Sequence, residues 1–497
     1  MKKTNYLFLI GLMLFSVLSV NAQYKTERSA EVKRLLEEAE VADSTLIISL
    51  EDAIKIALSE NTSVRVADKE VEKTGYAKQG SYSSLFPQIS ATGNYQRVIK
   101  KQVMYMDFEM PSMPGANPGT GGTGTGGTGT GGTGTGSTGS SSPKSNNGIE
   151  IGRSNTYSAG FSANMALVNA QAWQGIKISG LNVELAVEKA RASRIDMVGE
   201  VKKAYYSILF SKEAFNVYKD VYENAVENYN NTKARYDVQK ASELDYLRAK
   251  TTVSNAIPNV YNAESTVILA LWQLKAVLGI DLDMDIDVLG SLDDFSTEMF
   301  RDINENADFT LDKNSTLKQL EIQTMQLAEN IKLQKYAYIP TLGVAFSYTM
   351  NAMENEFDFA QYNWTPYSYV GLSLSIPIFS GGKRYNDVRQ AKSQYEQVKL
   401  QSVDTERRLK IAVKQGLTTM ETNMKTYYAA KESVDMAQKG YDIAEETYRV
   451  GRGTIIELND AQLALTQAKL GCSQAIYNFV TAKTQLEQTL GQDFINE

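Results

Sequence analysis

Two copies of one segment limit what this chain can fold into more than any other feature of its sequence. Residues 229–251 read YNNTKARYDVQKASELDYLRAKT, and residues 441–463 read YDIAEETYRVGRGTIIELNDAQL. The copies align without a gap, because each position in the first matches the position 212 residues later. In the second copy, Tyr and Ala recur at spacings of three and four, which indicates a helix. Gly451 then indicates the end of that helix, and the acidic residues after it indicate the first turn of a second helix. A repeat of this size is the first feature to use in predicting the fold, because both copies must form the same structural unit.

The repeat also includes the segments that precede each copy. Asn314 matches Asn61 and Pro340 matches Pro87, both at a spacing of 253 residues. The duplication therefore covers nearly the whole chain, and the drop in spacing from 253 to 212 places about forty extra residues in the first half. Residues 114–148 account for most of them, and their Gly, Thr and Ser composition predicts a flexible loop because it cannot bury a core.

The first residues have the features of an export signal. Lys2 and Lys3 form a basic start, residues 7–20 form an apolar core, and Ala22 ends a small-residue cleavage site. We therefore expect cleavage after Ala22 and export from the cytoplasm. A retained membrane anchor is the alternative, although the apolar run is short for a membrane span.

Composition excludes several classes of function. The chain has no His and a single Cys, Cys472, which excludes a disulfide within the chain and metal sites built on His or Cys. Nucleophilic sites that pair Ser or Cys with His are excluded for the same reason. We therefore expect no catalytic residues, no bound metal and no cofactor. The net charge of −7 argues against a nucleic-acid partner.

Four segments change from a helical period to the alternation of a β-strand. Residues 87–97, 157–167, 341–350 and 368–378 alternate larger apolar residues with small or polar ones. Strands of about ten residues can cross an outer membrane at a tilt. Small residues on the second face and aromatic residues near the ends favour a membrane barrel. The alternative is a soluble sandwich with one solvated face.

Each second strand leads into a very long helical segment. The residues from about 171 to 236 and from 383 to 448 contain no Pro. At a rise of about 1.5 Å per residue, each helix would span roughly 100 Å. Each returns as a second helix, over 243–279 and 455–491. Helices of this length and polarity are stabilised by packing on one another, as in a coiled coil.

Four strands from one chain cannot close a membrane barrel. Strand edges left open in lipid cost several kcal/mol for each unpaired group, so we expect the barrel to be shared between chains. Two chains would supply eight strands, whose interior is nearly filled by side chains. Three chains would supply twelve and leave room for a pore.

Five stretches give the chain a resemblance to the TolC family of outer-membrane efflux proteins. They are SLEDAIKIALSEN at 49–61, SLFPQI at 84–89, YIPTL at 338–342, GLSLSIPIFSGGKRYNDV at 371–388 and YRVGRGTIIELNDAQ at 448–462. The resemblance implies a homotrimer in the lipid of the outer membrane, with a twelve-stranded barrel and an α-helical tunnel in the periplasm. It also implies an exit duct that a periplasmic adaptor protein joins to an inner-membrane pump. Drugs, metals and secreted polypeptides are all compatible cargo.

The expected fold class is mixed α+β. A transmembrane β-barrel with four strands per chain would be shared by three chains and continued by a long periplasmic coiled-coil tunnel. The expected first half comprises a signal peptide at 1–22 and a repeat at 23–279, with strands at about 87–104 and 155–168, an external loop at 105–154 and a helical hairpin at 169–279. The expected second half comprises an acidic linker at 280–311 and a repeat at 312–497, with strands at about 340–350 and 367–379 and a helical hairpin at 381–492.

The resemblance also assigns a constriction to the helical tips. Glu457 and Asp460 match the positions of the family's acidic constriction. Three copies would form two rings of negative charge, which repel one another and attract cations. Without the resemblance, two solvated carboxylates at the start of a helix are the simpler interpretation. Opening would be an iris-like shift of the second helical hairpin, driven by partner binding.

A latch is the second role that the resemblance assigns. Tyr448 and Asp245 match a pair that links the two hairpin tips in relatives and holds the pore shut. A hydrogen bond from a phenol to a carboxylate is charge-assisted and suits a breakable contact. The family's latch arginine aligns with Gly453, and the adjacent Arg452 is the candidate for its role. The expected docking surface for adaptor helices consists of Val238, Gln239, Lys240, Val450, Gly451 and Arg452.

A surface protein is the competing hypothesis, with a barrel that only anchors and displays the Gly/Thr loop. Deleting residues 114–148 would separate the two, because an exit duct should still support export whereas a display protein should lose its role. An enzyme is disfavoured by the missing His and metal motifs.

Overall fold

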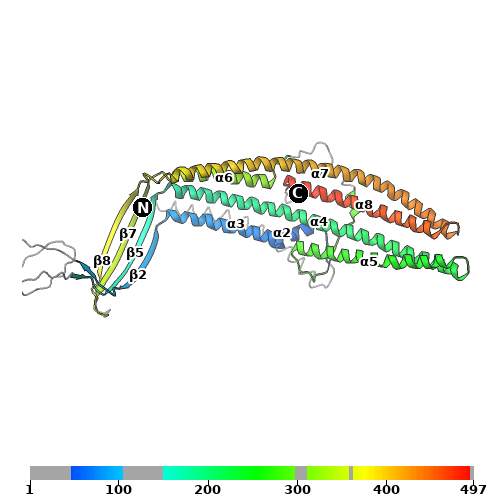
Figure 1. Ribbon diagram of the computed structural model, residues 1–497, viewed down its shortest axis with the longest axis horizontal. Helices are drawn as coiled ribbons and strands as arrows, with labels where there is room; N and C mark the ends of the chain where they lie inside the picture. Colours follow the sequence, from blue (N-terminus) through cyan, green and yellow to red (C-terminus); the bar gives the residue numbers. More distant parts are fainter. Residues whose placement is uncertain (1–45, 105–148, 297–309, 358–361, 493–497) are drawn as a thin grey trace, which may run out of the picture. The chain divides into compact units, whose positions relative to one another are not determined.

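The computed structural model describes residues 46–104, 149–296, 310–357 and 362–492 (Figure 1). The expected signal peptide and the Gly/Thr tract at 114–148 lie outside these residues. Within the described ranges, no helix combines the length and the apolar character that a membrane crossing requires.

The chain forms two units, one of strands and one of helices. The strand unit contains residues 83–169 and 340–376. The helical unit contains the described residues up to Tyr82, residues 170–339 and the described residues from Pro377 onward. Each unit therefore takes segments from both halves of the chain.

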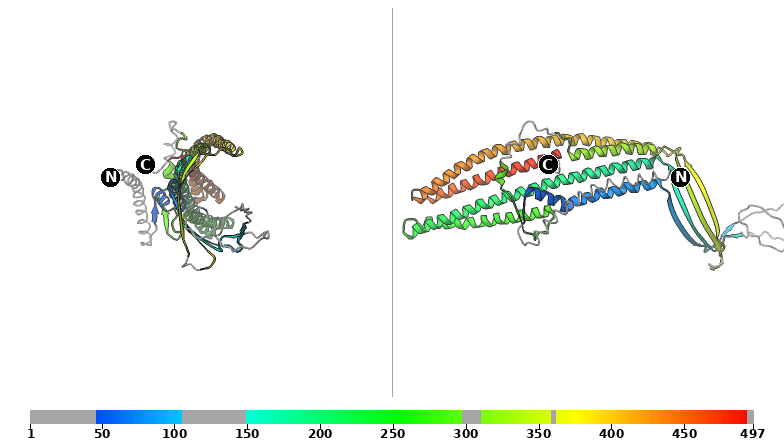
Figure 2. Two further views of the ribbon diagram at one scale, coloured as in Figure 1. Left: turned by 90° about the vertical axis from the view of Figure 1, so that its left-hand side faces the viewer. Right: turned by 180° about the vertical axis from the view of Figure 1, so that it is seen from behind.

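The strand unit is built on one antiparallel sheet. Its strands are β2 (Gln88–Arg97), β5 (Asn155–Val168), β7 (Thr341–Glu354) and β8 (Thr365–Ser375). They follow the order β2-β5-β7-β8 and are seen side by side in Figure 2. β2 pairs with β5 in the first half of the chain, and β7 pairs with β8 in the second. The pairing of β5 with β7 joins the two halves of the chain in one sheet.

The strand expected over about 87–104 is divided in the structure. β2 ends at Arg97, and the chain bends just after the hydrogen bond from the Val98 N–H to the Ser154 carbonyl. A separate strand, β3 (Gln102–Met104), then pairs with β4 (Ile149–Ile151) in a second, two-stranded sheet.

Two bounds in the second half also differ from expectation. β7 continues four residues beyond the expected end at 350, because it stays paired with β5 as far as Glu354 opposite Asn155. β8 ends at Ser375 rather than at 379, and Pro377 has no backbone N–H that could continue the ladder.

Most side chains of the four-stranded sheet are not buried within one chain. Every residue of β2 is exposed, and in β8 only Gly371 is partly covered. The described apolar residues that are buried in this unit are Tyr157, Ala352 and Tyr362, which pack with Trp364. A sheet needs a covered face to be stable in water. This sheet therefore lacks most of the packing of an independent soluble domain.

Among its described residues, the helical unit contains two long antiparallel hairpins and three shorter α-helices, and Figures 1 and 2 show them side by side. In chain order the helices are α2 (Leu50–Glu60), α3 (Thr62–Ser81), α4 (Ala170–Asp237), α5 (Glu243–Leu278), α6 (Ser315–Tyr336), α7 (Lys383–Arg449) and α8 (Ile455–Leu490). α4 turns back into α5, and α7 turns back into α8. α4 also packs along α3, α6 and α8, so it touches helices from both halves.

Two asparagines join the short helices to the hairpins in the same way. The Oδ1 atom of Asn61 accepts a hydrogen bond from the Ser63 N–H at 2.7 Å and so caps the start of α3. Its Nδ2 atom donates to the Val277 carbonyl, in the last turn of α5, at 2.7 Å. One buried side chain therefore satisfies two helix ends.

Asn314 makes the equivalent contacts in the second half. Its Oδ1 atom accepts from the Leu317 N–H at 2.9 Å, and its Nδ2 atom donates to the Thr489 carbonyl near the end of α8 at 2.6 Å. Gly491 ends α8 with a φ of 70°, and a Cβ atom there would lie 2.2 Å from the Lys313 carbonyl oxygen. α5 thus ends where α3 begins, and α8 ends where α6 begins.

The main core of the helical unit packs around Tyr205 of α4. The Tyr205 hydroxyl donates to the Leu289 carbonyl and lies 3.3 Å from the Ile48 carbonyl. These carbonyls belong to, or follow, the two short parallel strands β1 (Leu46–Ile48) and β6 (Ile286–Val288). Burial raises the pKa of Tyr205 to about 12, so the hydroxyl keeps its proton. The described part of the acidic segment that follows α5 is therefore anchored to the hairpins.

Candidate functional site at the helical tips

The first hairpin turns through a well-defined helix-ending motif. The N–H of Gln239 donates to the Tyr236 carbonyl at 2.9 Å, and the N–H of Lys240 donates to the Arg235 carbonyl at 2.7 Å. Gln239 has a φ of 60°. This is the Schellman motif, in which one residue in the left-handed conformation ends a helix.

The second hairpin repeats this motif 212 residues later. The N–H of Gly451 donates to the Tyr448 carbonyl at 3.0 Å, and the N–H of Arg452 donates to the Thr447 carbonyl at 2.9 Å. Gly451 has a φ of 81°, which Gly adopts more readily than Gln does at the matching position in the first hairpin.

The returning helices also begin alike. The Oγ atom of Ser242 accepts from the Asp245 N–H at 3.1 Å and donates to the Asp245 carboxylate at 2.7 Å. The Oγ1 atom of Thr454 accepts from the Glu457 N–H at 3.2 Å, and the Glu457 carboxylate accepts from the Thr454 N–H at 2.8 Å. The second arrangement is a capping box. Both carboxylates therefore help to start a helix.

The two residues predicted to form the constriction lie close together on α8. Glu457 and Asp460 are three positions apart, about one helical turn, and both side chains are exposed. Glu457 is held by Thr454, whereas Asp460 has no hydrogen-bond partner in the part of the chain that the structure describes.

The residues predicted to form the latch are not brought together. The Tyr448 hydroxyl bonds the Thr232 hydroxyl at 2.5 Å, and the Asp245 carboxylate bonds Ser242 on its own hairpin. Arg452 is exposed, and its side chain has no partner among the residues described here. Within one chain, Tyr448 is therefore tied to α4 and not to Asp245. The latch predicted from the resemblance stays a prediction about other states or other copies.

Sequence reasoning missed the actual partners of Tyr448, which are Thr232 and Arg235. Arg235 has an ordinary explanation, because an Arg in the last turn of a helix suits the helix dipole. One signal was present. At the matching positions the second copy has Ala444 and Thr447, so the first copy departs from the repeat where its side chains contact Tyr448.

The six residues predicted to dock a partner lie at the surface of both turns. The exposed fractions of Val238 and Val450 are 62% and 57%, which is high for apolar side chains. The other four, Gln239, Lys240, Gly451 and Arg452, are also exposed.

An apolar cluster lies behind the tips and joins the hairpins. It contains Ala249, Tyr441, Tyr448, Ile455, Leu458 and Leu465. Burial raises the pKa of Tyr441, whose hydroxyl donates to the Glu445 carboxylate at 3.3 Å. Tyr441 therefore takes part in the packing as a neutral side chain.

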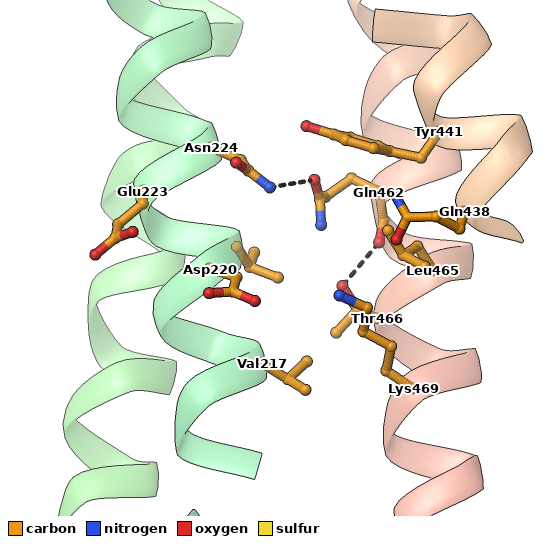
Figure 3. Close-up of a pocket in the computed structure, with 11 residues that line it drawn as sticks. Val217, Asp220, Glu223, Asn224, Gln438, Tyr441, Gln462, Leu465, Thr466 and Lys469 are labelled. Atoms are coloured by element: carbon orange, nitrogen blue, oxygen red, sulfur yellow. Dashed lines mark hydrogen bonds between the residues drawn. The ribbon is translucent and has the colours of Figure 1, made fainter. Parts of the chain in front are cut away.

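Hollows lie between the two hairpins in the described part of the chain. One has a volume of about 180 Å³ and is shown in Figure 3, where Asn224 Nδ2 donates across it to Gln462 Oε1 at 3.4 Å. A second hollow of about 380 Å³ lies beside Arg235 and is lined by Glu227, Glu445 and Glu446 among others. Over the described ranges, no group of three or more Asp, Glu or Cys side chains could hold a metal ion. Both hollows are polar clefts between helices.

The fold of this chain matches that of solved outer-membrane channels. The CmeC outer membrane channel of Campylobacter jejuni matches 89% of this chain and 85% of its own, with a TM-score of 0.68 and 15% identity. The VceC outer membrane protein of Vibrio cholerae matches 90% of this chain and 96% of its own, with a TM-score of 0.65 and 12% identity. At such identities the likeness concerns the fold alone.

The sequence identifies the family. The model of a family described as outer membrane efflux protein matches residues 132–280 and 308–492, more than half of the chain. The chain therefore belongs to this family, the TolC family of outer-membrane efflux proteins.

Curated relatives agree with this assignment. The outer membrane protein TolC of Escherichia coli strain K12 is 22% identical over 356 residues, which are 69% of this chain and 71% of TolC. The probable efflux pump outer membrane protein TtgC of Pseudomonas putida is 24% identical over 322 residues, 63% of this chain and 64% of TtgC. The predicted family, the outer-membrane location and the transport class are thus confirmed. The family is one of passive channels and not of enzymes, and the display hypothesis is not favoured.

Proposed function

We propose that three copies of this chain assemble into the outer-membrane exit duct of a tripartite efflux or secretion system, with a gate at the helical tips. One observation carries the proposal. The four-stranded sheet has two free edge strands, β2 and β8, that are exposed along almost their whole length. Unpaired strand edges are costly in lipid, so the sheet needs neighbours on both sides.

A barrel of three chains fits the composition of the sheet. Larger apolar side chains on β8, including Val370, Leu372 and Leu374, are exposed in one chain and would face lipid. Twelve strands would enclose a lumen, whereas eight would be nearly filled by side chains. α4 and α7 have 68 and 67 residues and would continue the lumen as a helical tunnel of roughly 100 Å.

Internal duplication accounts for how each chain contributes two hairpins to this tunnel. The joints at Asn61 and Asn314 make the same two kinds of hydrogen bond. α5 and α8 each have 36 residues, and each ends at a Gly in the left-handed conformation. Three duplicated chains would therefore surround the lumen with six similar hairpins.

The gate would be lined by the exposed carboxylates at the start of α8. Glu457 and Asp460 from three chains would form two acidic rings, which select cations and bind them. The exposed turns, including Val238 and Val450, would be the docking surface for a periplasmic adaptor that connects the duct to an inner-membrane pump. Relatives named as efflux pump outer membrane proteins support this kind of partner.

Single-channel recording in a planar bilayer tests the gate. Replacing both Glu457 and Asp460 by their amides should reduce cation selectivity and weaken block by multivalent cations. Gln at position 457 can keep the capping box with Thr454, so the start of α8 should remain intact. Glu264→Gln is the matched control, because Glu264 is an exposed acidic residue on α5 at a distance from the turn.

The outcomes are distinct. Unchanged selectivity and block in the double variant would show that these carboxylates do not line the pore. The mass of the complex in detergent tests the assembly, because three chains are expected. A stable, soluble single chain in the absence of detergent would contradict the shared barrel.

A further inference from the structure

The two faces of the four-stranded sheet differ in their chemistry. One face, called the apolar face from here on, carries the larger apolar residues, including Tyr348 of β7 and Phe161 directly opposite it on β5. The other face carries mainly small or polar residues, as in β2, where positions 88, 90, 92, 94 and 96 are all Gln, Ser, Thr or Asn. In the shared barrel proposed above, the apolar face would contact lipid and the polar face would line the lumen.

The four strands connect to the helical unit at one end of the sheet only. The helical unit comes before Gln88 and Thr341 in the chain, and it follows after Val168 and Ser375. β2 therefore ends at Arg97, at the opposite end of the sheet. In the proposed duct the helices extend into the periplasm, so the end at Arg97 would face the outside of the cell.

An aromatic cluster covers the apolar face at this outward end. Tyr95 of β2 and Tyr157 of β5 lie directly opposite each other, and their rings stack with centres 4.8 Å apart. The ring of Tyr362 lies 5.0 Å from that of Tyr157, and Phe357 meets both strand tyrosines edge-on at 6.3 Å. Tyr95 and Phe357 remain 50% and 74% exposed. Tyr side chains gather where a membrane meets water, because the ring is apolar and the hydroxyl is polar.

Basic side chains follow the aromatic cluster along the chain. Arg97 comes two residues after Tyr95, and therefore lies on the same face of β2. Lys100 and Lys101 follow in the bend between β2 and β3. Arg97 and Lys100 are exposed, and Lys101 is partly exposed. Over the residues that the structure describes, none of these three side chains has a hydrogen bond or an acidic partner.

A fourth basic side chain at this end is already paired. Arg153 donates from Nη1 to the Met353 carbonyl at 2.9 Å and also to the Glu354 carboxylate. This pair joins the residues before β5 to the end of β7. Arg97, Lys100 and Lys101 are therefore the cations at this end that remain available to a ligand.

We propose that Arg97, Lys100 and Lys101 bind the phosphate groups of a lipid in the outward leaflet of the membrane. This role rests on the barrel and the orientation proposed above. Lys and Arg bind phosphate through charge-assisted hydrogen bonds, and the planar guanidinium of Arg can make two of them in parallel. Three neighbouring cations attract a strongly anionic headgroup, such as a sugar with two phosphate groups, more than a zwitterionic one.

The surroundings of these cations favour a lipid over a free phosphate ion. Arg97 continues the apolar face, so a lipid with its headgroup at Arg97 would lay its acyl chains along the strands beside Tyr95. Ile99 lies between Arg97 and Lys100 in the chain and is 99% exposed. An apolar side chain in this position gains free energy when it leaves water for an apolar environment.

Native mass spectrometry of the full-length complex in detergent counts the lipid molecules that stay bound. Diphosphoryl lipid A, monophosphoryl lipid A and phosphatidylethanolamine are titrated separately. The unaltered protein should bind diphosphoryl lipid A most tightly and phosphatidylethanolamine most weakly. The triple variant Arg97→Gln, Lys100→Gln, Lys101→Gln should bind diphosphoryl lipid A about tenfold or more weakly, because it loses the charge-assisted hydrogen bonds.

Two controls separate this site from a general effect of charge. The triple variant Lys399→Gln, Arg407→Gln, Lys414→Gln removes the same charges from exposed positions on α7, and its affinity for the lipid should equal that of the unaltered protein. Inorganic phosphate, added at the concentration of the lipid, should not displace diphosphoryl lipid A.

Each outcome decides a different part of the proposal. Equal affinity of the unaltered protein and the first triple variant, or an equal loss in the control variant, would overturn the site. Equal affinity for diphosphoryl lipid A and phosphatidylethanolamine would overturn the preference for phosphate groups, and displacement by inorganic phosphate would overturn the assignment to a lipid.

The same spectra separate this proposal from the proposed function. They give the number of chains in the complex, and a number other than three would contradict the proposed duct. The lipid affinities would still decide the site, because Arg97, Lys100 and Lys101 belong to one chain.

Discussion

Replacing Asn314 by Ala tests whether the joint between α6 and α8 stabilises the helical unit. The substitution removes the cap of α6, which costs about 1 kcal/mol. It also leaves the Thr489 carbonyl without the donor that lies 2.6 Å away. A buried acceptor that loses its partner costs about 1–3 kcal/mol. The free energy of unfolding should therefore fall by about 2–4 kcal/mol.

Urea unfolding followed by helical circular dichroism measures this loss, at one fixed concentration of protein and of detergent. The midpoint should fall while the slope stays the same, because the surface exposed on unfolding does not change. Asn314→Ser can keep the cap but is too short to reach Thr489, so it should lose only about 1–3 kcal/mol. Asn61→Ala should lose about as much as Asn314→Ala, since Asn61 makes the matching bonds. Asn230→Ala, at an exposed position on α4, is the control and should change little.

Two results would refute this reasoning. A loss below about 0.5 kcal/mol for Asn314→Ala would mean that the two hydrogen bonds contribute no more than an exposed residue does. A large loss for Asn314→Ala together with none for Asn61→Ala would mean that the two joints are not equivalent.

Four further predictions concern single positions. Gly491→Ala should destabilise the protein by about 2 kcal/mol or more in the same urea assay, because its φ is 70° and a Cβ atom would lie 2.2 Å from the Lys313 carbonyl. Gly471→Ala, in the open interior of α8, should instead be neutral or stabilising by up to about 1 kcal/mol. Gly451→Ala should cost about 1–2 kcal/mol, seen as faster hydrogen exchange at the second turn, because Gly451 has a φ of 81°. Hydrogen bonds from Lys177, and then from Lys332 and Gln174, lower the pKa of Glu329 from 4.5 to about 2. A carboxyl whose pKa is lower in the folded protein than in the unfolded one stabilises the folded state above about pH 4.5. This contribution to stability is lost as the pH falls towards 2. The lowered pKa of Glu329 stabilises the folded state by at most about 3 kcal/mol, and the true figure is smaller because water screens the charge of the exposed Lys177. Stability measured at about pH 5 and pH 3 should therefore fall more in the unaltered protein than in Glu329→Gln, and equal falls would contradict the assignment.

Local signals determined the elements and much of the tip geometry. The turn around Gly451 and the capping sequence from Thr454 to Glu457 involve residues within five positions of one another. Such contacts are encoded by adjacent residue types, so the helix, turn and helix could be predicted from sequence. Strand bounds depend on distant residues, because β7 extends as far as β5 remains beside it, and that pairing joins residues about 200 positions apart.

The sequence by itself determined the repeat, the period of each segment, and the family to which the chain belongs. Only the tertiary structure decided that Asn61 and Asn314 each bond two helix ends, and that Tyr448 contacts Thr232 and Arg235 rather than Asp245. The physical reason is that a helical period specifies which face is buried but not which side chain it meets. That choice depends on how far each long helix is rotated and shifted along its neighbour, and many weak packing contacts set both together.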